Sequence, residues 1–184
     1  FGISKNPNHS RLAWIEEAAK TVKSSQEKLQ IYKTLLSFSR ESQVLGRALE
    51  VFLSLTKPSI DERVRTAAVY EAIAADRQDE RVRELMKSVI QRQDFPSSVQ
   101  AYCLSQLAMM RDGWLSKNWK KLVLARPESE VFQALLSTVH FLCPENLWEV
   151  FRELARENKS PELHLQLIRA LGFLKGQKSI ELLM

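Results

Sequence analysis

Apolar positions recur along this chain at intervals of three and four residues, which is the spacing of one face of an α-helix. Triplets spaced at roughly 0, 4 and 8 begin at Val64, Val99, Val131 and Leu163, so successive starts lie 35, 32 and 32 residues apart. A looser copy begins at Ile31, about 33 residues before Val64. Because the strict alternation that a half-buried strand needs is absent, the pattern predicts an all-helical chain built from a repeated unit.

The repeated unit is predicted to be a helical hairpin, because a second apolar-striped segment follows each first helix after a short polar break. Ser59 and Glu62 have the spacing of a capping box, and Ser160 precedes a proline that suits the first turn of a helix. We therefore expect an N-terminal helix at residues 10–23 and hairpins at approximately 25–56, 59–93, 96–126, 128–158 and 160–184.

Stacking of these hairpins is expected, because a single helix pair leaves an apolar stripe open on each side. The predicted fold class is all-α: an α-solenoid of about five stacked antiparallel helical hairpins in one domain, residues 1–184. A four-helix bundle with extra helices is the alternative, but it has no reason to repeat every 32 to 35 residues. The residues predicted to be buried between hairpins are Val64, Ala68, Val99, Cys103, Leu107, Val131, Leu135, Leu163 and Leu167.

The stretch KPSIDERVRTAA resembles the HEAT-repeat pattern through Pro58, Asp61, Val64, Arg65 and Ala68. In HEAT repeats the Asp and Arg are associated with a ladder between stacked units, so the resemblance implies a HEAT-like α-solenoid. The later copies keep the apolar positions but replace the arginine with Gln100, Phe132 and His164.

Two shorter similarities suggest a larger parent protein. VIQRQD and WLSKNWKKLV are similar to stretches in the C-terminal helical domain of M1-type zinc aminopeptidases, and VRTAA is similar to the helical region of large lipid-transfer proteins. The chain begins at Phe1 and ends within an amphipathic pattern, SIELLM, which we interpret as a fragment of a longer chain.

The composition adds constraints of its own. Five glycines and six prolines are few for 184 residues, which favours helices. The formal charge of +5 permits attraction to nucleic acid without requiring it. Cys103 and Cys143 are too few for a disulfide framework, which favours an intracellular setting, cytoplasmic or nuclear, and leaves secretion open. No apolar run reaches eighteen residues, so we expect no membrane insertion; the oligomeric state is left open.

No catalytic or metal-binding motif is present in the sequence. The histidines His9, His140 and His164 are scattered, and there is no HExxH, paired CxxC, G-x-S-x-G or glycine-rich phosphate loop. His140 and Cys143 share a helical face, but two ligands without a third favour a packed histidine and a buried thiol. We therefore predict a non-enzyme with no catalytic residues, no metal and no cofactor.

The strongest candidate for function is the basic tract RDGWLSKNWKKLVLAR, residues 111–126, which would suit a phosphate backbone or an acidic peptide. A second basic cluster, Arg77, Arg81, Arg83 and Lys87, lies on the preceding hairpin. The alternative is that the tryptophans are core and the lysines only solvate the helix. The candidate partner-binding residues are Arg111, Trp114, Lys117, Lys120, Lys121, Arg126, Arg81, Arg83 and Lys87.

Three functional hypotheses follow from these patterns. The first is a non-catalytic scaffold that binds a protein or peptide partner on a curved surface. The second is a nucleic-acid-binding module that resembles the HEAT-like DNA glycosylases, for which Asp112 beside Trp114 is the local candidate. The third is an auxiliary helical domain of a larger enzyme or lipid-transfer protein.

Overall fold

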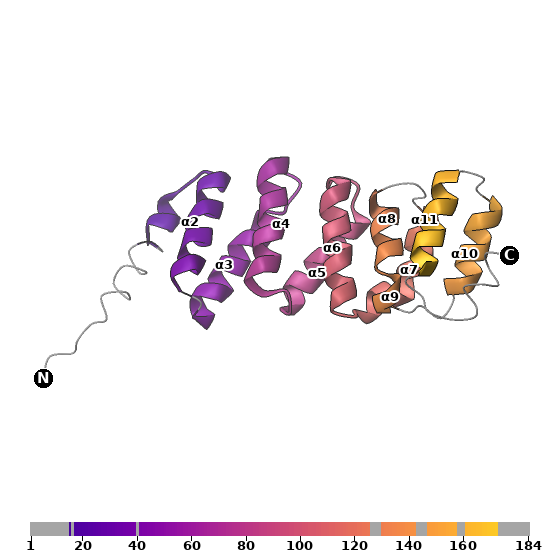
Figure 1. Cartoon of the computed structure of the whole chain (residues 1–184). Coiled ribbons are helices and arrows are strands. Elements are labelled where there is room, and N and C mark those ends of the chain that lie inside the picture. The colour runs from indigo at the N-terminus through magenta and orange to yellow at the C-terminus, as the bar shows by residue number, and fades with distance from the viewer. Residues whose placement is uncertain are drawn as a thin grey trace, which may run out of the picture. The chain divides into compact units, whose positions relative to one another are not determined.

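The structure is a computed structural model that describes residues 15, 17–39, 41–125, 130–142, 147–157 and 161–172. Every regular element within these ranges is an α-helix, which confirms the all-α prediction (Figure 1). Of the predicted N-terminal helix, residues 17–21 are helical, and residues 10–14 lie outside the described part of the chain.

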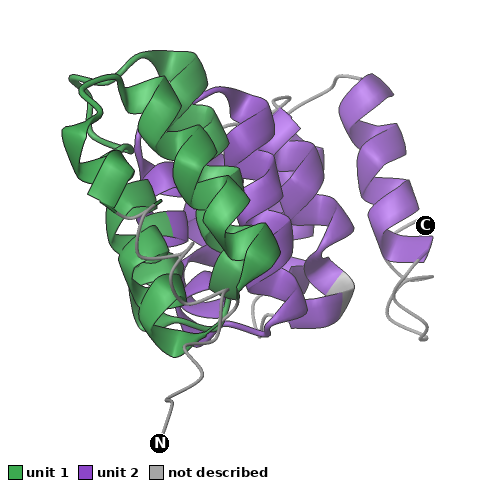
Figure 2. Cartoon of the chain, turned by 90° about the vertical axis from the view of Figure 1, so that its left-hand side faces the viewer, with its two compact units in different colours: residues 1–85 green, residues 86–184 purple. Residues whose placement is uncertain are grey.

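Two compact units, residues 1–85 and residues 86–184, make up the chain (Figure 2). The first unit holds α2 (Ser25–Phe38), α3 (Ser42–Ser54), α4 (Glu62–Asp76) and the first half of α5 (Glu80–Gln91). The second unit holds the rest of α5 and, in chain order, α6 (Ser97–Met109), α7 (Gly113–Ala125), α8 (Glu130–Ser137), α9 (Val139–Leu142), α10 (Leu147–Glu157) and α11 (Pro161–Gly172). The second helix expected in 160–184 falls outside the described residues.

In the first unit, α3 packs against both α2 and α4, and α2 also contacts α4. Side-chain caps fix where two of these helices begin. The Ser24 hydroxyl accepts a hydrogen bond from the Glu27 amide at 3.4 Å, and Asp61 Oδ1 accepts from the Arg63 and Val64 amides at 2.9 and 3.3 Å. The predicted capping box starting at Ser59 is therefore wrong: Asp61 is the N-cap of α4, because its carboxylate reaches two orphan amides of the first turn.

In the second unit, α8 contacts helices that precede it and follow it in the chain. α8 packs against α6 and against α11, which run side by side with it in Figure 1, whereas α7 packs against α8 and α10. The apolar repeat places its first residue in the first turn of each of these helices. Val99 is the third residue of α6, Val131 the second of α8, and Leu163 the third of α11.

The predicted core positions are buried, except for Val64, which is half-buried. The position that follows each repeat start also points inward. Arg65, Gln100 and Phe132 are buried there, whereas His164 is half-buried. The amide nitrogen of Gln100 donates to the carbonyl oxygens of Arg92 and Phe95, at 2.8 and 2.9 Å, which fixes the loop that enters α6. The buried amide nitrogen of Gln100 is tolerated there because two carbonyl oxygens accept from it.

Trp119 joins three helices of the second unit. Its ring is fully buried on α7, 6.2 Å from the Phe151 ring on α10, and its Nε1 donates to the Leu135 carbonyl oxygen at 3.3 Å. That carbonyl belongs to the last turn of α8, where no intrahelical donor is available to it. The Leu135 carbonyl also accepts from the Thr138 hydroxyl at 3.0 Å, so the indole adds a second donor there and ties the end of α8 to α7.

We expect Leu135→Ala to lower the free energy of unfolding by about 2–5 kcal/mol, because a fully buried leucine leaves a cavity. The control is Leu165→Ala on α11, where the side chain is 48% exposed and the change should stay within roughly 0.5 kcal/mol. Urea denaturation followed by circular dichroism measures both. Equal losses in the two variants would contradict the burial of this face of α8.

Candidate functional site

The candidate arginines of the second basic cluster are paired with acids in the first unit. Arg81 donates through Nε and Nη2 to the two carboxylate oxygens of Asp79, at 3.0 and 2.8 Å, and Arg83 pairs with Glu80. The side-chain hydrogen bond between Arg81 and Asp79 lowers the pKa of the carboxyl and raises the pKa of the guanidinium. Because Asp79 Oδ1 also accepts from the Arg81 amide at 2.8 Å in the first turn of α5, this pair stabilises the helix start.

Lys87, which belongs to the second unit, forms an ion pair with Asp112. Its ammonium lies 3.9 Å from Asp112 Oδ2, and the two side chains are only 16% and 8% exposed. Asp112 Oδ1 in turn accepts from the Trp114 amide at 2.9 Å and begins α7. Asp112 therefore acts as a helix cap and as a counter-ion for Lys87, a structural use that accounts for both carboxylate oxygens.

The basic tract of α7 divides into inward and outward side chains. Leu115, Trp119 and Val123 are buried, whereas Lys117 and Lys121 are exposed and lie one helical turn apart. Lys120 differs from these two lysines, because its ammonium lies 3.4 Å from Glu153 on α10. Trp114 is half-buried, and Arg126 lies outside the described residues.

Arg111 occupies a strained place in the turn between α6 and α7. Its φ is 53°, in the left-handed region where glycine is usual. The Arg111 amide donates to the Ala108 carbonyl at 2.9 Å, and the Asp112 amide donates to Leu107 at 3.0 Å. These two bonds form a Schellman motif at the end of α6, and they leave the guanidinium of Arg111 exposed.

A basic surface thus remains on the second unit, which we define as Arg111, Lys117 and Lys121. All three side chains are exposed, and none has an acidic partner among the residues that the structure describes. The other described cations among the candidates, Arg81, Arg83, Lys87 and Lys120, each have one. Sequence reasoning identified the tract but could not separate its paired cations from its unpaired ones.

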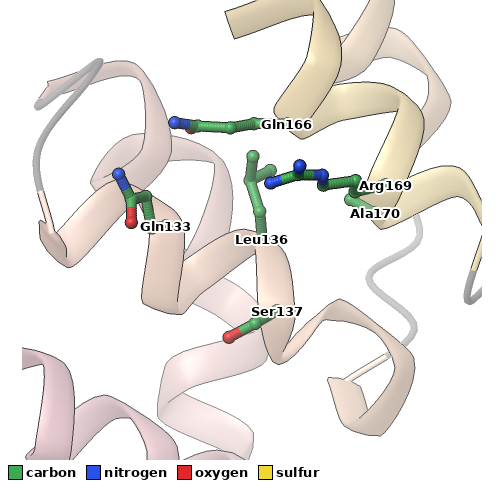
Figure 3. A pocket seen from close by; sticks show the side chains of 6 residues that line it. All are labelled: Gln133, Leu136, Ser137, Gln166, Arg169 and Ala170. Carbon is green, nitrogen blue, oxygen red and sulfur yellow. The ribbon is translucent and has the colours of Figure 1, made fainter. Parts of the chain in front are cut away.

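A cleft between α8 and α11 is a second feature of this unit and was not predicted from the sequence. It encloses about 280 Å³ and is lined by Gln133, Leu136, Ser137, Gln166, Arg169 and Ala170 (Figure 3). Gln133 and Gln166 belong to no sequence motif that indicates a binding site, so the sequence alone did not single them out. The repeat register is the signal that could have found them, because it places residues near 133 and 166 at the same level of neighbouring helices.

No group of three or more His, Cys, Asp or Glu in the described ranges could hold a metal ion. His164 donates through Nε2 to the Ala155 carbonyl at 3.3 Å, which ties α11 to α10. The prediction that His140 is packed and Cys143 is a buried thiol falls on side chains outside the described part of the structure. Among the described helices, none is long and apolar enough to cross a lipid bilayer.

In comparisons with known proteins, no family model, no curated protein and no solved structure matches this chain. The class that the structure defines is therefore an all-helical protein whose helices pack against their neighbours.

We expect Arg111→Gly to raise the free energy of unfolding by about 0.5–1 kcal/mol. Relief of left-handed strain, about 1–2 kcal/mol for a residue with a Cβ, exceeds the added entropy of an unfolded glycine, about 0.5–1 kcal/mol. Thermal and urea unfolding measure the change, with Arg111→Ala as the control that keeps the strain. A destabilised glycine variant would contradict the strained turn.

Burial raises the pKa of the Cys103 thiol to about 12, so the thiolate fraction at pH 8 is roughly one in ten thousand. We expect Cys103 in a Cys143→Ser background to resist a thiol-reactive reagent until the chain is unfolded in urea. Because the folded pKa is the raised one, the stability gained from protonated Cys103 is present below about pH 8.5 and is lost as the pH rises toward 12. Rapid labelling of the native protein would contradict its burial.

Proposed function

We propose that this chain is a non-catalytic, HEAT-like α-solenoid scaffold that binds a protein or peptide partner. The proposal rests on which helices contact each other in the second unit. There α6 packs on α8, α8 packs on α11, and α7 packs on α10. Repeated hairpins pack in this way when each unit buries its apolar stripe on the next. The α2–α4 contact of the first unit, beside α3, follows the same rule.

An acidic peptide suits the basic surface better than nucleic acid does. Solenoids that bind a nucleic acid backbone need a broad basic stripe, because each phosphate contact contributes only a small share of the affinity. Ion pairs occupy Lys87 and Lys120, which leaves three described cations of the candidate set on this unit. Two exposed lysines one helical turn apart match two carboxylates of a short acidic run.

Nucleic acid binding is the second candidate function, and the exposure of Lys117 and Lys121 is the observation that favours it. If the basic surface binds DNA through its three cations, the logarithm of affinity should fall with the logarithm of salt concentration with a slope of about −3.

Fluorescence anisotropy with a labelled polyglutamate peptide and with single- and double-stranded DNA, at two salt concentrations, tests these functions. The test variant is Lys117→Glu/Lys121→Glu. The matched control is Lys23→Glu/Lys57→Glu, which changes the net charge equally at exposed sites of the first unit. We expect the test variant to lose about tenfold or more in peptide affinity, and the control to lose much less, because exposed charges act over roughly one Debye length.

Polyglutamate binding that is absent, or that falls equally in both double variants, would contradict the proposed peptide-binding role of the basic surface. DNA binding that is tighter than peptide binding, and that the Lys117→Glu/Lys121→Glu variant abolishes, would replace it with the second candidate.

A further inference from the structure

The side of α11 that faces away from its buried residues carries two exposed apolar side chains. Leu165 and Ile168 are 48% and 47% exposed, and they lie three residues apart, so they form one strip on the helix surface. At about 100° per residue, this strip lies on the far side of the helix from Leu163 and Leu167, which are buried. The second unit therefore presents an apolar strip to solvent at α11.

The repeat register shows that the same position is covered by packing on the neighbouring helices. Ile168 lies five residues after the repeat start of α11, and Leu104 and Leu136 occupy the same position on α6 and α8. Leu104 is 0% exposed and Leu136 is 3% exposed. Each belongs to a helix on which the next helix of the register packs, α8 on α6 and α11 on α8. The strip on α11 thus continues a helix-packing interface that the second unit already uses twice.

Two charged residues flank the apolar strip. Glu162 and Arg169 are exposed and seven residues apart, which is close to two helical turns, so they lie along the same edge of the strip. The acidic residue is at the N-terminal end of that edge and the basic residue is at the C-terminal end. Two copies of this face match when the helices run antiparallel, because the acidic end of each then meets the basic end of the other.

We propose that the face formed by Glu162, Leu165, Ile168 and Arg169 binds the same face of a second copy of this chain. The two α11 helices run antiparallel about a two-fold axis midway between Leu165 and Ile168. Each Leu165 then packs on Ile168 of the partner subunit. Each Glu162 lies within about 3 Å, measured along the helix axis, of Arg169 of the partner subunit. Because the basic surface takes no part, this association is independent of the proposed peptide binding.

The dimer is expected to be weak. A single pair of 12-residue helices makes a small contact, and interfaces below roughly 1,200 Å² are typical of transient association. We therefore expect a dissociation constant of roughly 0.1–1 mM, with the chain almost entirely monomeric at low micromolar concentration.

Sedimentation equilibrium of the full chain, from about 20 µM to about 1 mM, tests the proposal. We expect the weight-average mass to rise from the monomer value toward the dimer value over this range. Leu165→Asp/Ile168→Asp should stay monomeric throughout and keep its helix content by circular dichroism, because both side chains are exposed. Arg152→Glu, which changes an exposed cation on α10, is the control and should associate as the unmodified chain does.

Charge exchange tests the two flanking residues. Glu162→Arg and Arg169→Glu each place like charges opposite one another, and each should weaken the dimer about tenfold. The double variant Glu162→Arg/Arg169→Glu should recover most of the loss, because the ion pairs form again with the signs reversed. Two charges that served only the fold of one chain would not give this recovery.

Disulfide crosslinking in a Cys143→Ser background tests the orientation. When Leu165→Cys and Ile168→Cys variants are mixed and oxidised, the mixed dimer should exceed both homodimers, because the two-fold axis places position 165 opposite position 168. A chain that stays monomeric up to about 1 mM would overturn the proposal, as would crosslinking mainly within each variant. In a monomer, slow thiol labelling at position 165 would show that another segment of the same chain covers the face. Rapid labelling there would leave the face to a different protein.

Discussion

The packing of α8 between α6 and α11 is the interaction on which the second unit depends. With eight residues, α8 is below the length of about 12–15 residues at which isolated helices become marginally stable, so its neighbours must stabilise it. It buries Val131, Phe132, Leu135 and Leu136, and Trp119 satisfies a carbonyl at its end. The cleft lies between two of these helices, and Leu136 of α8 and Ala170 of α11 are among the residues that line it.

Helix capping determines which charges remain available for binding. Asp79 and Asp112 each accept an amide hydrogen bond at a helix start and also pair with a cation, Arg81 and Lys87 respectively. The cap hydrogen bond and the helix dipole already hold each aspartate side chain at the helix N-terminus. Its ion pair with a nearby cation therefore costs little additional side-chain entropy. The candidate cations are thus divided between structural ion pairs and the exposed basic surface, which decides the binding chemistry.

The sequence pattern predicted the helices and much of the core, because helical periodicity is a local property. Val99, Val131 and Leu163 occupy matching first turns for that reason. It did not predict α9, which follows when α8 stops at Ser137 and Thr138 turns its hydroxyl to the Leu135 carbonyl at 3.0 Å.

Features that depend on which helices become neighbours were also beyond the sequence. Lys120 and Glu153 are 33 residues apart, and only the packing of α7 on α10 brings them together. The cleft residues Gln133 and Gln166 belong to helices that the repeat register relates but that no motif marks.

In the second unit, α8 packs between α6 and α11, and equivalent positions on these helices are 32 residues apart. Ser98 and Glu162 are exposed and lie two repeats apart in this register, one on α6 and one on α11. Spin labels on cysteines at these two positions, in a Cys143→Ser background, allow the distance to be measured by pulsed electron paramagnetic resonance. With α8 between the labelled helices, two helix spacings predict roughly 20 Å. A distance near 10 Å, which would place α6 directly against α11 as in a closed bundle, would contradict the account.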